Sequence, residues 1–223
     1  MSSFNAVKAK SPIGEFSWVT VSGQGKLNYN KDGYVYQVVQ TIHKDVAAPF
    51  IAEIDAVLDQ CPKDLKIRSR GYKPVWKALE DHDNLKAGQM FVETDDRRRT
   101  DKDELTDFYM FSYQTKTTFS DGKTKEIGVY NSKGHKVDLG ERLVGNGSMG
   151  RVSCKIKPYV NGRASGVSLY LNGIQITKFV EFQGDSFDAL EGDFDGFDND
   201  DLSGDFTETQ TSVQVSKEDT ISL

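Results

Sequence analysis

The last forty residues carry a charge opposite to that of the rest of the chain, and this limits where a folded domain can lie. Residues 184–223 hold 12 acidic residues and one basic residue, for a net charge of −11, whereas residues 1–183 hold 27 basic and 22 acidic residues, for +5. The acidic segment mixes Asp, Gly and Phe without a helical or strand period, so it cannot bury enough apolar surface to offset its ordering entropy. We expect a folded basic domain over 1–183 and a disordered acidic tail over 184–223.

Strand patterns dominate the basic part of the chain. Segments rich in β-branched and aromatic residues predict strands, and Asn172-Gly173 predicts a hairpin that joins 167–171 to 174–180. Because there is no βαβ alternation, six to eight strands with one clear helix favour a mainly β fold, a closed or nearly closed antiparallel barrel. The other predicted strands are residues 16–21, 34–42, 108–113, 116–119, 125–130 and 151–157.

One helix is predicted after Asp45, which is a good N-cap residue. Apolar residues then recur at helical spacing along one face until Pro62: Phe50, Ile54, Val57 and Leu58. Residues 62–106 form a long charged excursion between strands, with a short helix expected at about 75–80.

The composition argues for a soluble protein of the cytoplasm, which would be the host cytoplasm if the protein is viral. Cys61 and Cys154 lack the spacing of metal ligands, which indicates reduced thiols. The N-terminus has no apolar region typical of a secretory signal. No apolar run approaches the roughly 18 residues that a membrane span requires, so we expect no membrane partner.

Catalytic patterns are absent from the sequence. His43, His82 and His135 are isolated from one another, and no Gly-rich phosphate loop is present. The acidic run at 193–201 fits neither the ligand spacing nor the terminal Glu of a calcium loop. We expect no enzyme activity, no cofactor and no metal.

Residues 151–157 alternate between an apolar and a cationic face. Arg151, Lys155 and Lys157 share the cationic face because side chains alternate along a strand, and Tyr159 continues the same parity. Cations can neutralise successive phosphates, and a flat ring can stack on an unpaired base. The face is therefore either a surface for single-stranded nucleic acid or an ordinary solvated outer face.

Residues 66–77 interleave cations with aromatic rings and contain no acid. Arg68, Arg70, Lys73 and Trp76 are candidate contacts to single-stranded nucleic acid. The alternative is an ordinary basic loop with Trp76 in the core.

A third candidate is the aromatic face formed by Tyr109, Phe111 and Tyr113. It is either a platform on which bases stack or the interior of the barrel, and the sequence leaves both interpretations open.

Four motifs in a fixed order resemble a known family. They are VYNSKGHK at 129–136, LVGNGS at 143–148, CKIKPY at 154–159 and GVSL at 166–169, and an acidic tail follows. In this order they resemble the single-stranded DNA-binding proteins of tailed-phage replisomes, of the short-tailed coliphage type.

The resemblance implies an oligonucleotide-binding (OB) barrel that protects single-stranded DNA in replication, recombination and repair. It also implies a homodimer, and an acidic tail that recruits the polymerase and the helicase-primase. From the opposite charges of tail and body, we further expect the tail to compete with DNA. Tyr159 matches a stacking aromatic residue of the family, and Arg70 matches a DNA-contacting arginine. The tail residues expected to bind partners are Asp193, Phe194, Asp195, Phe197, Asp198, Asp200 and Asp201.

The sequence departs from the family at two places. The tryptophan that the family carries shortly after Pro-Tyr is absent, because residues 160–163 read VNGR. The Phe and Asp residues of the tail lie at 187–206, and the chain ends Ile-Ser-Leu instead of in an aromatic residue. The alternative function is a structural or interaction β-barrel, such as a virion component, without affinity for nucleic acid.

Overall fold

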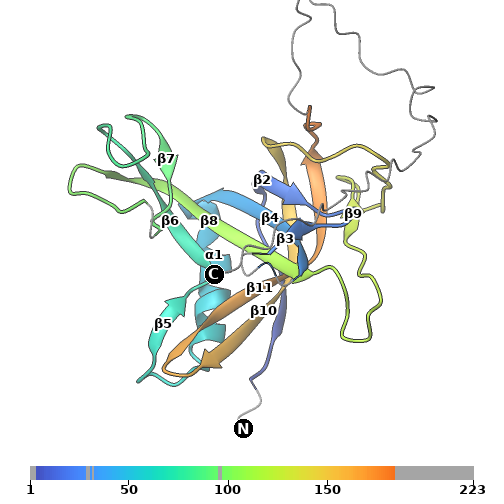
Figure 1. The fold of residues 1–223 in the computed structure, drawn as a ribbon, viewed down its shortest axis with the longest axis horizontal. Coiled ribbons are helices and arrows are strands. Elements are labelled where there is room, and N and C mark those ends of the chain that lie inside the picture. Colours follow the sequence, from blue (N-terminus) through green and yellow to red (C-terminus); the bar gives the residue numbers. More distant parts are fainter. Residues whose placement is uncertain (1–3, 29–30, 32, 95–96, 184–223) are drawn as a thin grey trace, which may run out of the picture. The chain divides into compact units, whose positions relative to one another are not determined.

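Five long strands form a closed barrel in the computed structural model, which describes residues 4–28, 31, 33–94 and 97–183 (Figure 1). The order around the barrel is β2, β4, β8, β11, β10 and back to β2. Every neighbouring pair is antiparallel except β8 and β11, which run parallel and share two register pairs. The five strands are β2 (Gly14–Thr20), β4 (Tyr34–His43), β8 (Glu104–Lys116), β10 (Ser148–Asn161) and β11 (Ala164–Lys178).

This architecture confirms the predicted mainly β fold, a closed barrel with one main helix. Six shorter strands, most of them not predicted, extend the barrel into one 11-stranded sheet. Short strands carry little periodicity, so most of them left no sequence signal. They are β1 (Val7–Lys10), β3 (Lys26–Leu27), β5 (Lys66–Ser69), β6 (Tyr72–Lys77), β7 (Met90–Phe91) and β9 (Gly128–Tyr130).

The helix α1 (Lys44–Leu58) packs its predicted apolar face against β4, β8, β10 and β11. Phe50, Ile54 and Val57 belong to the same buried cluster as the inward side chains of the barrel. The predicted cap at Asp45 is wrong, because His43 is the N-cap and its Nδ1 accepts a hydrogen bond from the Asp45 N–H at 3.4 Å.

Two local predictions are wrong for reasons of long-range pairing. Residues 75–80 do not form a helix. Residues 75–77 belong to β6, which pairs with β7 and with the first half of β8, and residues 78–80 follow this strand. Asn172-Gly173 is not a hairpin turn, because β11 runs through it. Gly173 pairs with Ser153 and Leu171 with Cys154, which leaves Asn172 as the extra residue of a β-bulge. The hairpin between β10 and β11 instead turns at Gly162, whose φ is +60°.

Beyond the barrel, β6, β7 and the first half of β8 form an arm with its own small core (Figure 1). Ala78, Leu85 and Phe91 are buried there, apart from the main cluster, and Trp76 packs against them. The Arg99 guanidinium lies 4.6 Å from the centre of the Trp76 ring. The arm is therefore held together by contacts of its own.

Candidate nucleic-acid interface

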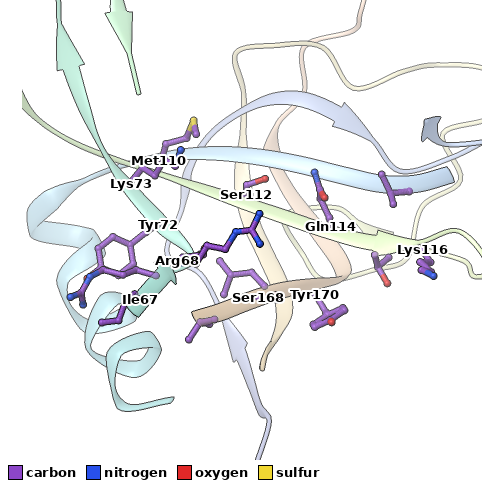
Figure 2. A pocket seen from close by; sticks show the side chains of 17 residues that line it. Ile67, Arg68, Tyr72, Lys73, Met110, Ser112, Gln114, Lys116, Ser168 and Tyr170 are labelled. Carbon is purple, nitrogen blue, oxygen red and sulfur yellow. The ribbon is translucent and has the colours of Figure 1, made fainter. Parts of the chain in front are cut away.

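An open groove crosses the outer face of β8, between β5 and β6 on one side and β11 on the other (Figure 2). Its volume is about 760 Å³. Arg68, Lys73 and Lys116 bring positive charge to its walls, and no described residue that lines it is acidic. The full lining is Val35, residues 67–73, Met110, Ser112, Gln114, Thr115, Lys116 and residues 167–170.

Alternation along β8 gives the groove a polar floor. Ser112, Gln114 and Lys116 point outward, whereas Phe111 and Tyr113 point into the barrel. The Gln114 side chain is held in place because its Nε2 donates to the Gln37 Oε1 at 2.8 Å. The floor therefore presents hydroxyl and amide groups, which can hydrogen-bond to nucleic acid of any sequence.

Phe111 and Tyr113 are not stacking residues, which corrects two of the predicted DNA contacts. Both side chains have no exposed surface. The Tyr113 hydroxyl donates to the Gln40 Oε1 at 3.0 Å, and burial raises the pKa of Tyr113 well above its usual value. Tyr109 is half-buried and contacts the Tyr72 ring edge-on, with centroids 5.7 Å apart.

The predicted cations of residues 66–77 lie on two short strands beside the groove. β5 pairs in parallel with the beginning of β11, and this pairing places Arg68 on the groove wall. Figure 2 shows the Arg68 side chain extending towards the space between Ser112 and Ser168. Within the described ranges, the Arg68 guanidinium has neither an ion pair nor a hydrogen bond. It is therefore available to an anion.

Arg70 and Lys73 line the groove but are already engaged. The Arg70 Nη1 lies 3.5 Å from Asp55 Oδ1, and the Tyr72 hydroxyl donates to the same carboxylate at 3.1 Å. Burial, together with the Asp55 charge, raises the pKa of Tyr72. The Lys73 amine donates to the Glu93 carbonyl at 2.9 Å. We expect Arg68 to contribute more to anion binding than either of these two residues.

The cationic face of β10 adjoins the groove through β11. Lys155 is opposite Tyr170 and Lys157 is opposite Ser168, and opposite residues of an antiparallel pair share one face. Because Ser168 and Tyr170 line the groove, both lysines lie on the same outer face beside it. We call the groove together with Lys155, Lys157 and Tyr159 the groove face.

Tyr159 lies opposite Gly166 of β11, and its ring packs over this glycine. A Cβ atom at Gly166 would lie 2.8 Å from the Tyr159 Cζ and 2.7 Å from the Ser69 carbonyl oxygen. The phenol end of Tyr159 therefore covers a position that only glycine can occupy. The ring is half-buried, so part of it remains open to stack on a base.

Arg151 and Trp76 do not line the groove. Arg151 lines a separate cavity of about 340 Å³ with Lys10, Tyr130 and Gln175, and its buried Nε has no hydrogen-bond partner among the described residues. Arg151 keeps the outward parity of Lys155 and Lys157 along β10, but it lies nearer the start of the strand and lines this other cavity instead of the groove. Trp76 belongs to the arm.

Sequence reasoning missed several groove residues, namely Gln114, Lys116, Ser168 and Tyr170. Tyr170 has a detectable signal, because it alternates with the buried Leu169 and Leu171. The strand predicted at 167–171 already contains Tyr170, so its parity alone would have placed this side chain opposite the buried leucines.

The predicted tail residues Asp193, Phe194, Asp195, Phe197, Asp198, Asp200 and Asp201 lie outside the described residues. Within the described part, no group of three or more His, Cys, Asp and Glu side chains could hold a metal ion. No helix among the described residues is long and apolar enough to cross a membrane.

Comparison with known proteins gives a structural likeness only. No protein-family model matches the chain, and no curated protein matches it. The crystal structure of gp2.5, a single-stranded DNA-binding protein encoded by bacteriophage T7, is similar with a TM-score of 0.53 at 16% identity, over 96% of this chain and 100% of that chain. This likeness confirms the predicted fold resemblance.

A second similar structure is the single-stranded DNA-binding protein from bacteriophage Enc34 in complex with single-stranded DNA. Its TM-score is 0.47 at 12% identity, over 82% of this chain and 96% of that chain.

Proposed function

We propose that this chain is a non-enzymatic protein that binds single-stranded DNA on the groove face without sequence preference. One observation carries the proposal: a groove lined by cations, with no acidic residue in its lining, crosses β8, the third strand of the barrel, and reaches Val35 on β4, the second strand. This is the face with which OB barrels bind oligonucleotides. The T7 protein, which shares the fold, is described as a single-stranded DNA-binding protein.

The chemistry of the groove face suits unpaired nucleotides. Arg68, Lys116, Lys155 and Lys157 would neutralise successive phosphates, which gives affinity that is independent of sequence. Tyr159 and the exposed Tyr170 would stack on bases, a contact that every base can make. A duplex keeps its bases stacked inside, so these rings favour single strands.

The charge split supports a regulatory tail. Residues 184–223 carry −11 and residues 1–183 carry +5, so the tail can act as a mimic of DNA that competes for the groove face. DNA that fills the groove would release the tail to recruit replication proteins. We further propose that the protein acts in phage replication, recombination and repair in the cytoplasm. We also propose that it forms a homodimer and that its tail contacts the polymerase and the helicase-primase.

Fluorescence anisotropy with labelled oligo-dT and with a duplex of equal length tests the proposal. We expect binding to oligo-dT to be much tighter than binding to the duplex. Deletion of 184–223 should raise or preserve the affinity, and a loss of affinity would contradict competition by the tail. No affinity for oligo-dT at moderate salt would favour the alternative, a structural or interaction β-barrel.

A further inference from the structure

We infer that Trp18 is a base-stacking residue that extends the groove face past Lys116, and that Lys26 beside it binds the phosphate of the same nucleotide. The inference rests on the proposed function and adds a subsite formed by β2 and β3. Its ligand is an unpaired nucleotide of the bound strand.

The first observation is that Trp18 points outward against the pattern of its strand. Gly14 and Phe16 are buried on the inward face of β2, and a regular strand would send Trp18 to the same side. The register with β4 shifts between Ser17 and Thr20, which marks a β-bulge at Trp18. As a result the indole is 69% exposed, more than any other large hydrophobic side chain among the described residues. Bulges re-aim side chains in this way and are frequent beside binding sites.

The second observation is backbone strain at the same residue. The φ of Trp18 is +50°, in the left-handed region that bulky residues avoid. The Trp18 N–H donates to the Asn146 Oδ1 at 3.0 Å, and the Gly147 N–H donates to the Phe16 carbonyl at 3.0 Å. The loop at 145–147 thus holds β2 in the bulged conformation. Neither the exposure of the indole nor the strain stabilises the fold, and both are accounted for if the ring has a ligand.

The third observation connects Trp18 to the groove through three neighbouring strands. Lys26 on β3 is opposite Val35 on β4, and Val35 is opposite Lys116 on β8. Opposite residues share a face, and both Val35 and Lys116 line the groove. Neighbouring strands lie about 4.8 Å apart, so Lys26 continues the groove about 10 Å beyond Lys116. The Lys26 amine lies 6.0 Å from the centre of the Trp18 ring.

This arrangement supplies the two contacts that an unpaired nucleotide needs. The indole offers a wide ring to a base, and the lysine beside it offers a charge to the phosphate. The loop that carries Lys26 is anchored to the barrel, because the Tyr36 hydroxyl donates to the Gly23 carbonyl at 3.1 Å. A bound strand that leaves the groove at Lys116 would therefore meet a fixed stacking site.

The test uses the full-length chain and an oligo-dT series of about 4 to 16 nucleotides, the range of site sizes of OB folds. In a Trp76→Phe background Trp18 is the only tryptophan, and we expect saturating oligo-dT of the longer lengths to quench its emission. Trp18→Ala should weaken binding of the longer oligonucleotides about 5- to 150-fold, the effect of losing one stacked base. Trp18→Phe should keep most of the affinity, and the shortest oligonucleotides that bind should be insensitive to all these changes.

Trp18→Gly separates a binding role from a structural one. Glycine accepts the φ of +50° without strain, so this variant should keep or raise the melting temperature while it weakens DNA binding. An unchanged affinity in Trp18→Ala at every length, or unquenched Trp18 emission at saturation, overturns the inference.

Anisotropy of the labelled oligonucleotide distinguishes failure of this inference from failure of the proposed function. Wild-type binding that depends on Arg68 but not on Trp18 overturns only this inference. An absence of wild-type binding overturns the proposed function as well.

Discussion

Replacement of Lys155 and Lys157 by glutamine should halve the salt dependence of binding to a single-stranded oligonucleotide that is too short to reach Lys26. Four cations of the groove face have no ion pair or hydrogen bond to other described residues: Arg68, Lys116, Lys155 and Lys157. Each is free to neutralise one phosphate, and the double variant removes two of the four. Glutamine keeps the first two methylene groups of the side chain and both positions are exposed, so strand β10 should fold as before.

The magnitude follows from counterion release. On a single strand, each neutralised phosphate contributes about −0.7 to the slope of log K against log salt concentration. Four contacts predict a slope of about −2.8, so the affinity should fall about 50-fold between 50 and 200 mM salt. Two contacts predict a slope of about −1.4, which corresponds to a fall of about 7-fold over the same range.

The assay is anisotropy of labelled oligo-dT at several salt concentrations, with a matched control variant. Lys86→Gln with Lys123→Gln removes the same charge from lysines that already pair with Asp81 and Asp121 and that do not line the groove. The control should keep the wild-type slope. Equal slopes in the wild type and the Lys155/Lys157 variant, or an equal reduction in the control, would refute the assignment of the groove face.

Three further changes test individual residues. Tyr159→Ala should weaken oligo-dT binding by about 1–3 kcal/mol, measured by anisotropy, and a wild-type affinity would remove Tyr159 from the site. Tyr113→Phe should lower the free energy of unfolding by about 1–3 kcal/mol in urea titrations, because it leaves the buried Gln40 Oε1 without its donor, whereas DNA affinity should not change. Burial raises the pKa of the Cys154 thiol to about 12, so Cys154 should resist Ellman's reagent at pH 8 and react only in denaturant; rapid labelling of the folded protein at Cys154 would contradict its burial.

The local sequence pattern was sufficient to predict burial where a segment has one solvent-exposed face and one buried face. The alternation at 151–157 predicted a strand with its cations outward, and β10 has this alternation of buried and exposed positions. The apolar spacing after Asp45 predicted the buried face of α1. In both segments a single periodicity fixes which side chains are buried, so no information from distant residues is needed.

Pairing between distant segments decided the features that the sequence could not predict. Asn172-Gly173 has the composition of a turn, but its partner on β10 makes it a bulge. The aromatic face of 108–113 was recognised, yet only closure of the barrel determines that Phe111 and Tyr113 are inside. Trp18 is a further example. Alternation along its strand indicates a buried side chain, and only the register with β4 reveals the bulge that turns it outward.

The parallel pairing of β8 with β11 has fewer register pairs than any other pairing around the barrel, and it lies directly under the groove. Its two register pairs are Leu169 with Tyr113 and Tyr170 with Gln114. Three of these four residues line the groove: Leu169, Tyr170 and Gln114. A ligand that spans the groove would therefore contact both strands of this short pairing and add interactions across it. Under the proposed function, a bound strand would therefore also increase the resistance of the barrel to unfolding.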